Sequence, residues 1–508
     1  MLVSVTTAAE AASGDRAAIA AGVSQAELMR RAGVSAASEI VRRYPSLTHG
    51  RVAVVTGPGN NGGDGWIVAS ELAGAGASVR VTQLAEPRTD AARAARDAAL
   101  PRVEIGSLES APLVVDALLG TGARGEPEGE LARTINAIRS ERDAGATVVA
   151  LDVPSGLDAT TGEGRLCVIA DLTLTFATMK RGLLGRRDCA GRIVVIDIGI
   201  GKTQPAGPPG LVDDEWVHAH IPRIAADAHK GTRRKLLIVG GQRGMAGAAI
   251  IAARAALRSG IGMVRAVVED ESLPVMQAAV PHATATSWKE LDSADGASAA
   301  LGWADVVLVG PGLGRAEGRR EMVERVLAAG SQPMVLDADA LTLFRGLTDQ
   351  LGAALRARPS VLTPHPAEFG QLSGMSVADV ASGRYEVGRE LARVLRSVLL
   401  LKGVPTVITS PAGERVVSAS GTPVLATAGS GDMLAGIAAT LLAQMDDPLA
   451  AATCAAWIHG RAAELTQGAR RPRGVTLDDV ELALRQVWSE PVCERIAPAL
   501  AELPMVEP

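Results

Sequence analysis

Residues 51–65 read RVAVVTGPGNNGGDG, an apolar run that ends in a loop of glycines, asparagines and an aspartate. The run is almost continuously apolar, as expected for a strand buried on both faces of a parallel sheet. A glycine-rich turn between such a strand and a helix can present backbone N–H groups to a phosphate. The stretch therefore predicts a doubly wound α/β sheet with a ligand site where this strand ends.

A second stretch of this kind lies far along the chain, where residues 428–432 read AGSGD before an apolar segment, 433–438, that predicts a buried helix. Small residues let a phosphate approach the first-turn N–H groups, and the helix dipole favours its charge. Asp432 would then lie beside a transferring phosphoryl group as the base for a substrate hydroxyl. An aspartate in a first turn also stabilises a helix by itself, which is the structural alternative.

The length of 508 residues is ample for two domains of ordinary size. Apolar runs alternate with helical segments from about residue 51 to 200, and the alternation resumes after a stretch rich in proline and glycine at 201–210. We predict an α/β protein with a Rossmann-like three-layer αβα domain at 1–205 and a second α/β domain at 212–500. The expected strands are 51–56, 78–84, 113–119, 147–153, 172–177 and 192–200, then 235–239, 263–268, 305–309, 333–336, 360–362, 398–401 and 406–409. Two helices, 25–32 and 36–43, are expected to pack on the first domain.

Composition excludes several classes of protein. A net charge of −5 with three Phe and two Tyr argues against a nucleic-acid partner, because the chain has no overall basic field and few stacking platforms. Four cysteines without CxxC spacing fit packing roles in a reducing compartment. No segment reaches the roughly 18 apolar residues of a membrane span, and the N-terminus does not resemble a signal peptide. We expect a cytoplasmic protein without a membrane partner. We also expect a homo-oligomer, since most soluble oligomers are built from identical chains.

Polar residues follow two further strands of the first domain. Asp116 lies in the third run, and Asp152 and Ser155 follow the fourth. Since ligands collect at the carboxyl ends of parallel strands, these side chains and Asn61 could converge there, and an oxygen-only cluster suits a hard cation. The alternative is that both aspartates cap turns or helices. Lys180 is predicted to be a solvated surface charge.

At these residues the first domain resembles the YjeF N-terminal family of NAD(P)H-hydrate epimerases over about residues 10–205, and GNNGGDG is the most specific part. The resemblance implies a potassium ion held by Asn61, Asp116 and Ser155. It also implies inversion of the hydroxyl-bearing C6 of a hydrated nicotinamide, for which Asp152 is the proton-transfer residue. The residues implied to contact the substrate are Asn60, Asn61, Gly62, Gly63, Asp64, Gly120, Thr121, Gly122, Ala123, Arg124, Gly125, Glu126 and Asp152.

Three further loops outline a mononucleotide pocket around Asp432: 310–314, 363–368 and 402–406, each after an expected strand. Each is ordinary alone, since the first could be a tight turn and His365 in the second a satisfied helix cap.

Together these loops resemble the ribokinase-like superfamily and, within it, the ADP-dependent NAD(P)H-hydrate dehydratases, over about residues 215–490. Kinases of the superfamily typically carry Asn-x-x-Glu where this chain has His365-Pro366-Ala367-Glu368, and Asp-Thr where it has Ala426-Thr427. Both departures favour the dehydratase over a kinase. The resemblance implies ADP as co-substrate, with magnesium. The resemblance places Ala248, Gly312, Gly314, His365 and Asp432 around the hydrate, and Lys402, Gly403, Val404, Pro405, Thr406 and Gly431 around the nucleotide.

The resulting hypothesis is a bifunctional repair enzyme whose small-molecule substrates are hydrated NADH and NADPH with ADP. One alternative is an ATP-dependent kinase for a hydroxymethyl-bearing vitamin precursor, fused to a Rossmann-like regulatory domain. Another is a first domain that senses a ligand or binds a partner without turnover.

Overall fold

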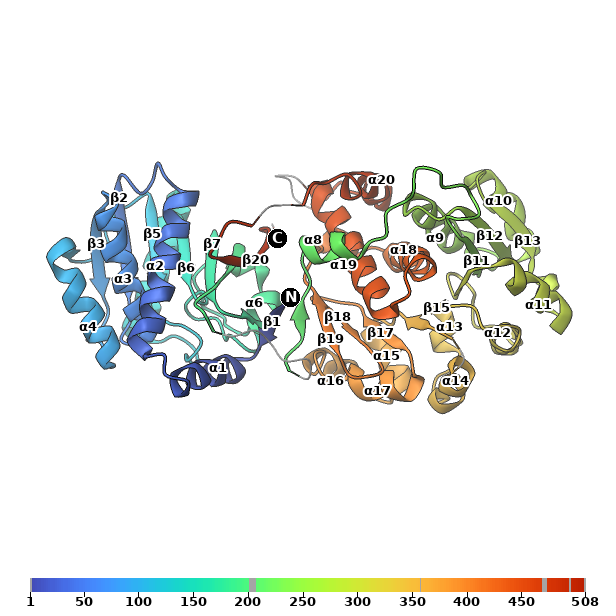
Figure 1. The fold of residues 1–508 in the computed structure, drawn as a ribbon, viewed down its shortest axis with the longest axis horizontal. Helices are drawn as coiled ribbons and strands as arrows, with labels where there is room; N and C mark the ends of the chain where they lie inside the picture. The colour runs from blue at the N-terminus through green and yellow to red at the C-terminus, as the bar shows by residue number, and fades with distance from the viewer. Residues whose placement is uncertain (1, 201–206, 357, 468–472, 493–494, 507–508) are drawn as a thin grey trace. The chain divides into compact units, whose positions relative to one another are not determined.

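The computed structural model describes residues 2–200, 207–356, 358–467, 473–492 and 495–506 (Figure 1). These residues form two compact units, one ending at Leu211 and including the chain after residue 494, the other beginning at Val212. Residues 201–206 of the expected boundary, and Cys493, lie outside the described residues. No helix among the described residues is long and apolar enough to cross a membrane.

The sheet of the first unit is doubly wound, which confirms the predicted fold class. Its central strand β2 pairs in parallel with β3 on one side and β5 on the other, so the strand order reverses there. All its strands are parallel except β20, which is antiparallel to β9. In spatial order they are β20 (Ala499–Leu503), β9 (Arg192–Ile196), β7 (Leu172–Phe176), β6 (Thr147–Leu151), β5 (Leu113–Ala117), β2 (Arg51–Thr56), β3 (Ser78–Gln83) and β4 (Glu104–Ile105).

Helices cover both faces of this sheet because β2 is apolar on both. Val52 and Val54 pack with Trp66 of α3 in one buried cluster, and Ala53 and Val55 pack with α5 in another. The helices are α2 (Gln25–Arg43), α3 (Asn60–Gly74), α4 (Asp90–Ala99) and α5 (Gly129–Asp143). We expected two helices where α2 is one. The chain stays helical through Gly33, where any side chain would overlap Ile67 of α3, so the glycine allows close packing of the two helices.

Short elements complete the first unit. Strand β1 (Val3–Thr6) pairs with β8 (Met179–Lys180) and β10 (Gly210–Leu211), and α1 (Ala8–Ala20) follows it. Helices α6 (Arg181–Gly185) and α7 (Arg187–Ala190) precede β9. The chain after residue 494 returns to this unit, whereas we expected the second domain to continue to residue 500. Ion pairs from Arg43 and Arg192 to Glu502 fasten β20, and so short an edge strand carries little sequence signal.

The second unit is also a parallel-rich α/β sheet, with the strand order reversing at β11, between β12 and β14. All seven strands expected here are confirmed, and β13 and β19 extend the sheet at its edges. Strands β17, β18 and β19 are mutually antiparallel. In spatial order the strands are β13 (Thr284–Ser287), β12 (Met263–Val268), β11 (Lys235–Val239), β14 (Val306–Val309), β15 (Met334–Leu336), β16 (Ser360–Leu362), β17 (Val398–Leu401), β18 (Thr406–Thr409) and β19 (Arg415–Ser418).

One face of this sheet is covered by the buried helix α18 (Ser430–Gln444), which packs tightly on α9 (Ala246–Arg258). A side chain at Gly436 would overlap the backbone of Ala252, so the glycine sets this close approach. A large cluster around Phe344 and Phe369 fills the other face. The remaining α-helices are α8 (Asp214–His220), α10 (Leu273–Ala279), α11 (Ala294–Trp303), α12 (Arg319–Ala328), α13 (Asp339–Thr342), α14 (Thr348–Leu355), α15 (Pro366–Ser373), α16 (Val377–Ser382), α17 (Gly388–Leu395), α19 (Pro448–Gln467) and α20 (Leu477–Val487).

Candidate active sites

The glycine loop of the first unit runs from the end of β2 into α3. A side chain at Gly57 would overlap the carbonyl of Leu118, and one at Gly62 would overlap the carbonyl of Gly57. These two glycines are therefore required by backbone packing. Gly59, in contrast, has open space around its Cα, and it is the N-cap of α3 without a side-chain cap. The first-turn N–H groups of α3 are thus free of a capping side chain at the switch point of the sheet.

Beside this loop, Asn61, Asp116 and Ser155 meet around the backbone of Leu119. Asp116 accepts hydrogen bonds from Ser155 Oγ at 2.6 Å and from Ser155 N at 2.8 Å. The N–H of Leu119 donates to Ser155 Oγ at 2.9 Å, and Asn61 Nδ2 donates to the Leu119 carbonyl at 2.8 Å. Asn61 Oδ1 is left buried with no hydrogen-bond partner. Burial raises the pKa of Asp116 to about 6 despite its hydrogen bonds.

The three side chains predicted to hold a cation are therefore close together, and the unpartnered Asn61 oxygen is a donor that a cation would satisfy. The described residues contain no group of three or more His, Cys, Asp and Glu side chains that could hold a metal ion. A cation at this place would have to rely on amide and hydroxyl oxygens beside one carboxylate, which suits a hard, weakly charged ion better than zinc.

Asp152 follows β6 in a left-handed conformation, with φ of 64°. Lys180 Nζ lies 2.7 Å from Asp152 Oδ1, and Oδ2 accepts hydrogen bonds from the N–H of Thr121 at 3.0 Å and from the Thr121 hydroxyl. Although burial raises the pKa of Asp152, Lys180 and Thr121 hold it below its usual value. Asp152 is thus a buried carboxylate that stays ionised.

The prediction that Lys180 is a solvated surface charge is wrong. Its residue is 2% exposed, and its Nζ also donates to the Phe176 carbonyl at 2.8 Å. The physical reason is that the buried carboxylate of Asp152 requires a counter-charge, and β8 carries Lys180 to it. No sequence spacing links positions 152 and 180, so only the fold reveals the pair.

A second carboxyl in this site has the opposite character. Burial, and next the negative charge of Asp152, raise the pKa of Asp64 well above its usual value. Gly120 connects the two halves of the site, because a Cβ there would lie 3.1 Å from Asn61 Cβ and 3.2 Å from Asp152 Oδ2. The site therefore combines a carboxyl group with a lowered pKa, Asp152, and one with a raised pKa, Asp64, a pairing suited to proton transfer in both directions.

Most of the remaining predicted substrate residues of this unit lie on its surface, whereas Gly63 is buried beside Met29. Arg124 lies 3.6 Å from Asp158, and Glu126 accepts hydrogen bonds from Arg165 N, so the structure does not bring either side chain to Asp152. Asn60 accepts a hydrogen bond from the hydroxyl of Thr89. Glycines 122 and 125 have open space around them.

In the second unit, Asp432 lies in the first turn of α18, whose N-cap is Gly429 with φ of 94°. Burial raises the pKa of Asp432 to about 7, and the next contribution comes from the negative charge of Asp337. Gly431 lies directly over Lys402, since a Cβ there would lie 3.2 Å from Lys402 Nζ. The helix start, the carboxyl and the lysine predicted from sequence are therefore brought together.

Lys402 joins a buried charge cluster with two carboxylates. Its Nζ lies 2.9 Å from Asp337 Oδ1 and 3.8 Å from Glu368 Oε2, and Thr363 Oγ1 donates to Asp337 Oδ1 at 2.7 Å. Burial alone would lower the pKa of Lys402, but Asp337 and Glu368 hold it above its usual value. Our sequence reasoning missed Asp337. It directly follows β15, the same strand-end position that drew attention to Asp152, so the signal was present.

The glycines of the loop after β14 allow it to pack closely against its neighbours. A side chain at Gly310 would overlap the carbonyl of Asp337, and a Cβ at Gly312 would lie 3.1 Å from Ala248 Cβ. Gly314 N donates to Asp339 at 2.9 Å. The predicted hydrate-contacting residues Ala248 and Gly312 are thus neighbours in space.

His365 is the N-cap of α15. Its Nδ1 accepts hydrogen bonds from Ala367 N and Glu368 N, and the N–H of His365 donates to Glu368 Oε2 at 2.9 Å. The helix-cap interpretation is therefore correct, and contact with a substrate through the half-exposed ring stays a prediction.

Two further groups near the nucleotide residues were missed. His459 Nε2 lies 3.3 Å from Ser430 Oγ, and burial lowers its pKa to about 4. Arg384 donates to the Pro405 carbonyl at 2.7 Å beneath the 402–406 loop, whose Val404 is strongly exposed. Neither has a local motif around it.

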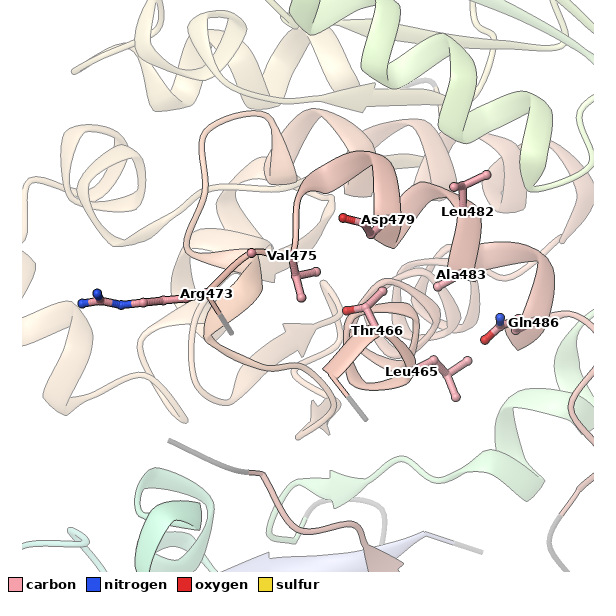
Figure 2. Close-up of a pocket in the computed structure, with 9 residues that line it drawn as sticks. Leu465, Thr466, Arg473, Val475, Asp479, Leu482, Ala483 and Gln486 are labelled. Atoms are coloured by element: carbon pink, nitrogen blue, oxygen red, sulfur yellow. The ribbon is translucent and has the colours of Figure 1, made fainter. Parts of the chain in front are cut away.

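A cavity of about 440 Å³ lies between the C-terminal end of α19, residues 473–475 and one side of α20 (Figure 2). Its lining includes Thr466, Asp479 and Gln486, and none of the predicted site residues. It is therefore separate from the cluster at Asp432.

Two family models match the chain, one in each unit. The model described as YjeF-related protein N-terminus matches residues 25–182, and the model described as NAD(P)H-hydrate dehydratase matches residues 236–485. A crystal structure of the ADP/ATP-dependent NAD(P)H-hydrate dehydratase from Bacillus subtilis, co-crystallised with ATP/Mg²⁺, is 31% identical, with a TM-score of 0.48. It covers 55% of this chain and 96% of its own.

Full-length relatives align across both units. A protein of Moorella thermoacetica named bifunctional NAD(P)H-hydrate repair enzyme Nnr is 36% identical, covering 91% of this chain and 93% of its own length. The Escherichia coli protein of the same name is 35% identical, covering 95% and 93%. The chain therefore belongs to the family of bifunctional NAD(P)H-hydrate repair enzymes.

Proposed function

We propose that the first unit interconverts the R and S epimers of hydrated NADH and NADPH, and that the second dehydrates the S epimer with ADP. The products are NAD(P)H, AMP and phosphate. The observation that carries the proposal is Asp432, a carboxyl with a pKa of about 7 at the start of a buried helix, beside Lys402. A base that titrates near neutral pH and lies beside phosphate-binding groups is what phosphorylation of a hydroxyl requires.

In the dehydratase unit, the C6 hydroxyl is converted into a better leaving group. Asp432 accepts the hydroxyl proton while the C6 oxygen attacks the terminal phosphorus of ADP, and the bond to AMP breaks. The C6–O bond then breaks and inorganic phosphate leaves, while loss of a proton from C5 forms the C5–C6 double bond. The second pKa of phosphate, about 6, makes it a far better leaving group than hydroxide. The N-terminus of α18 and Lys402 stabilise the phosphate charge. Magnesium would accompany the nucleotide and neutralise its charge.

In the epimerase unit, inversion at C6 requires a bond to that carbon to break and re-form on the opposite face. Asp152, ionised beside Lys180, is the proton acceptor, and Asp64, whose pKa burial raises well above its usual value, is the donor. Thr121 and Lys180 fix the carboxylate of Asp152 in place. A potassium ion would be held by Asn61, Asp116 and Ser155, where it would supply positive charge near the bound nucleotide.

One assay tests both activities. The purified chain is incubated with a mixture of R and S hydrated NADH and either ADP or ATP, and the dihydronicotinamide absorbance is followed. Complete recovery with ADP requires both units, because a dehydratase specific for the S epimer leaves the R epimer behind. No recovery with either nucleotide, together with phosphorylation of a hydroxymethyl vitamin precursor from ATP, would instead establish the kinase alternative.

The two units are separated by matched variants. Asp152→Ala should leave consumption of the S epimer intact and strand the R epimer, whereas Asp432→Asn should stop recovery altogether. If Asp152→Ala epimerises at the wild-type rate, Asp152 is not the proton-transfer residue, and a first unit that only binds ligand gains support.

A further inference from the structure

Two cysteines of the first unit lie next to each other in the fold although 22 residues separate them. Cys167 Sγ is 3.2 Å from Cys189 Sγ, and both residues are buried. A disulfide needs about 2.05 Å between its sulfurs, so a shift of roughly 1 Å would join them. The described residues contain no group of three or more His, Cys, Asp and Glu side chains that could hold a metal ion, at this pair or elsewhere. Cys454, the other described cysteine, is buried in the second unit.

The surroundings of the pair favour reaction of a thiolate. The guanidinium of Arg186 lies 2.7 Å from Cys189 Sγ. Asp188, the neighbour of Cys189 in α7, is half exposed, so the cysteine pair lies one residue layer below the surface. The hydrogen bond between the thiols, and then the positive charge of Arg186, lower the pKa of Cys167, whereas the same hydrogen bond and burial raise the pKa of Cys189. Thiolates beside a cation and a second thiol are the usual sites of reversible oxidation.

The pair is also connected to the proposed cation site. The N–H of Val168, next to Cys167, donates to the carbonyl of Ser155 at 2.9 Å. A Cβ on Gly156 would lie 3.0 Å from Cys167 Cα, so the two backbone segments are in direct contact. On the other side, the N–H of Ala170 donates to the Cys189 carbonyl at 2.8 Å. Movement of Cys167 toward Cys189 would therefore be passed to Ser155.

We propose that Cys167 and Cys189 form a reversible disulfide that slows the first unit when the protein meets a peroxide. One thiolate attacks hydrogen peroxide, the S–O bond forms as the O–O bond breaks, and hydroxide leaves and is protonated to water. The second thiol then attacks the sulfenic sulfur, the S–S bond forms and a second water leaves. The two thiols are oxidised by two electrons, the peroxide is reduced, and a dithiol reductant reverses the change.

The test uses the full chain, reduced and then treated with hydrogen peroxide. Free thiols counted after denaturation should fall from four to two, and a non-reduced digest should contain a peptide linking Cys167 to Cys189. Cys167→Ser and Cys189→Ser should each abolish that peptide, and Cys454→Ser, the matched control at a buried thiol, should retain it. Random pairing with Cys454 or Cys493, or no loss of thiols while free glutathione is oxidised, would overturn the proposal.

The activity readout rests on the proposed function of the first unit. Oxidised wild-type protein should lose epimerase activity severalfold and regain it with dithiothreitol, while the dehydratase rate stays constant as an internal control. Both serine variants should keep their epimerase rate in peroxide. An unchanged epimerase rate in protein that carries the disulfide would refute the switch. Absence of epimerase activity in the reduced protein would instead count against the proposed function.

Discussion

The two units contain the same arrangement of three side chains, used in different ways. In the first, Asp152 is held by Lys180 and Thr121, and in the second, Asp337 is held by Lys402 and Thr363. In each, an aspartate at a strand end receives a lysine and a threonine hydroxyl at the carboxyl edge of a parallel sheet.

The difference lies in which carboxyl group the lysine pairs with. In the first unit, Lys180 pairs with the proposed proton-transfer residue itself and holds the pKa of Asp152 below its usual value. In the second, Lys402 pairs with Asp337, and the negative charge of Asp337 helps to raise the pKa of Asp432 to about 7. A base that is always ionised suits exchange in both directions, and a base near neutral pKa suits removal of a proton from a hydroxyl during phosphoryl transfer.

The largest effect is expected from Asp432→Asn. The amide keeps the size of the side chain but cannot accept a proton, so the dehydratase rate should fall by about 10²- to 10⁴-fold. Recovery of dihydronicotinamide absorbance from the S epimer with ADP measures it. The epimerase rate serves as the control, since the substitution lies in the other unit. A loss below tenfold would show that Asp432 is not the base and would remove the contrast between the two aspartates.

The two lysines provide the next comparison. Lys180→Met leaves Asp152 as an unpaired buried carboxylate, a change that typically costs about 3–5 kcal/mol. Lys402→Met removes the ammonium group that lies between the carboxylates of Asp337 and Glu368. Each substitution should destabilise only its own unit, as hydrogen exchange of peptides from each unit in increasing urea can measure.

The double variant Lys180→Met with Asp152→Asn is the matched control, because it removes the charge that the lysine neutralises. It should recover most of the lost stability without recovering epimerase activity. If the double variant is as unstable as Lys180→Met, packing of the lysine side chain, and not the ion pair, supports the site.

The sequence predicted the groups that follow local rules and missed those that depend on the fold. Asp432 and Asp152 could be recognised because each lies beside a glycine loop or a strand end, positions defined by a few neighbouring residues. Lys180 and His459 lie on elements without such a motif, and their burial depends on contacts with distant residues. Lys180 was predicted to be exposed because lysine usually is.

Central strands were predicted more reliably than edge strands. Central runs such as 235–239 are apolar on both faces and have one interpretation, whereas β20 joins the first unit through ion pairs of Glu502 that no periodicity reveals. The break expected within α2 is absent because Gly33 is a packing residue and not a helix end.

The pH dependence should separate the two bases. Between pH 6 and 8 the ionised fraction of a group with a pKa of about 7 rises about tenfold, so dehydratase kcat/KM should rise by that factor. The epimerase should rise by no more than about twofold, from Asp116 with its pKa of about 6, since Asp152 is already ionised and deprotonation of the proposed donor Asp64 would lower the rate. Rates measured in one buffer series would show it, and parallel profiles would contradict the comparison.

The same shift has a consequence for stability. The folded pKa of Asp432 lies above its usual value of 3.8, so its contribution to stability is complete below about pH 4 and is lost as pH rises through 7. Asp432→Asn should therefore be stabilised relative to wild type at pH 8 and not at pH 4, as urea midpoints would show.

The smallest effects are expected from the two threonines. Thr363 is fully buried and its hydroxyl donates to Asp337, so Thr363→Val should destabilise the second unit by about 2 kcal/mol, the range for a hydrogen bond to a charged group. Thr121→Val should cost the first unit less than about 1 kcal/mol, because Thr121 is only half-buried and its own N–H still donates to Asp152.

Serine at either position keeps the hydroxyl and is the matched control, so Thr363→Ser should retain more stability than Thr363→Val if the hydrogen bond matters. Urea unfolding with a peptide-level readout distinguishes the units. Equal losses of stability in Thr363→Val and Thr121→Val would mean that the backbone N–H of Thr121 does not compensate for the missing hydroxyl at Asp152. In that case the Thr121 hydroxyl and Lys180 together keep Asp152 ionised, and the pH profile of the epimerase in Thr121→Val should shift toward that of the dehydratase.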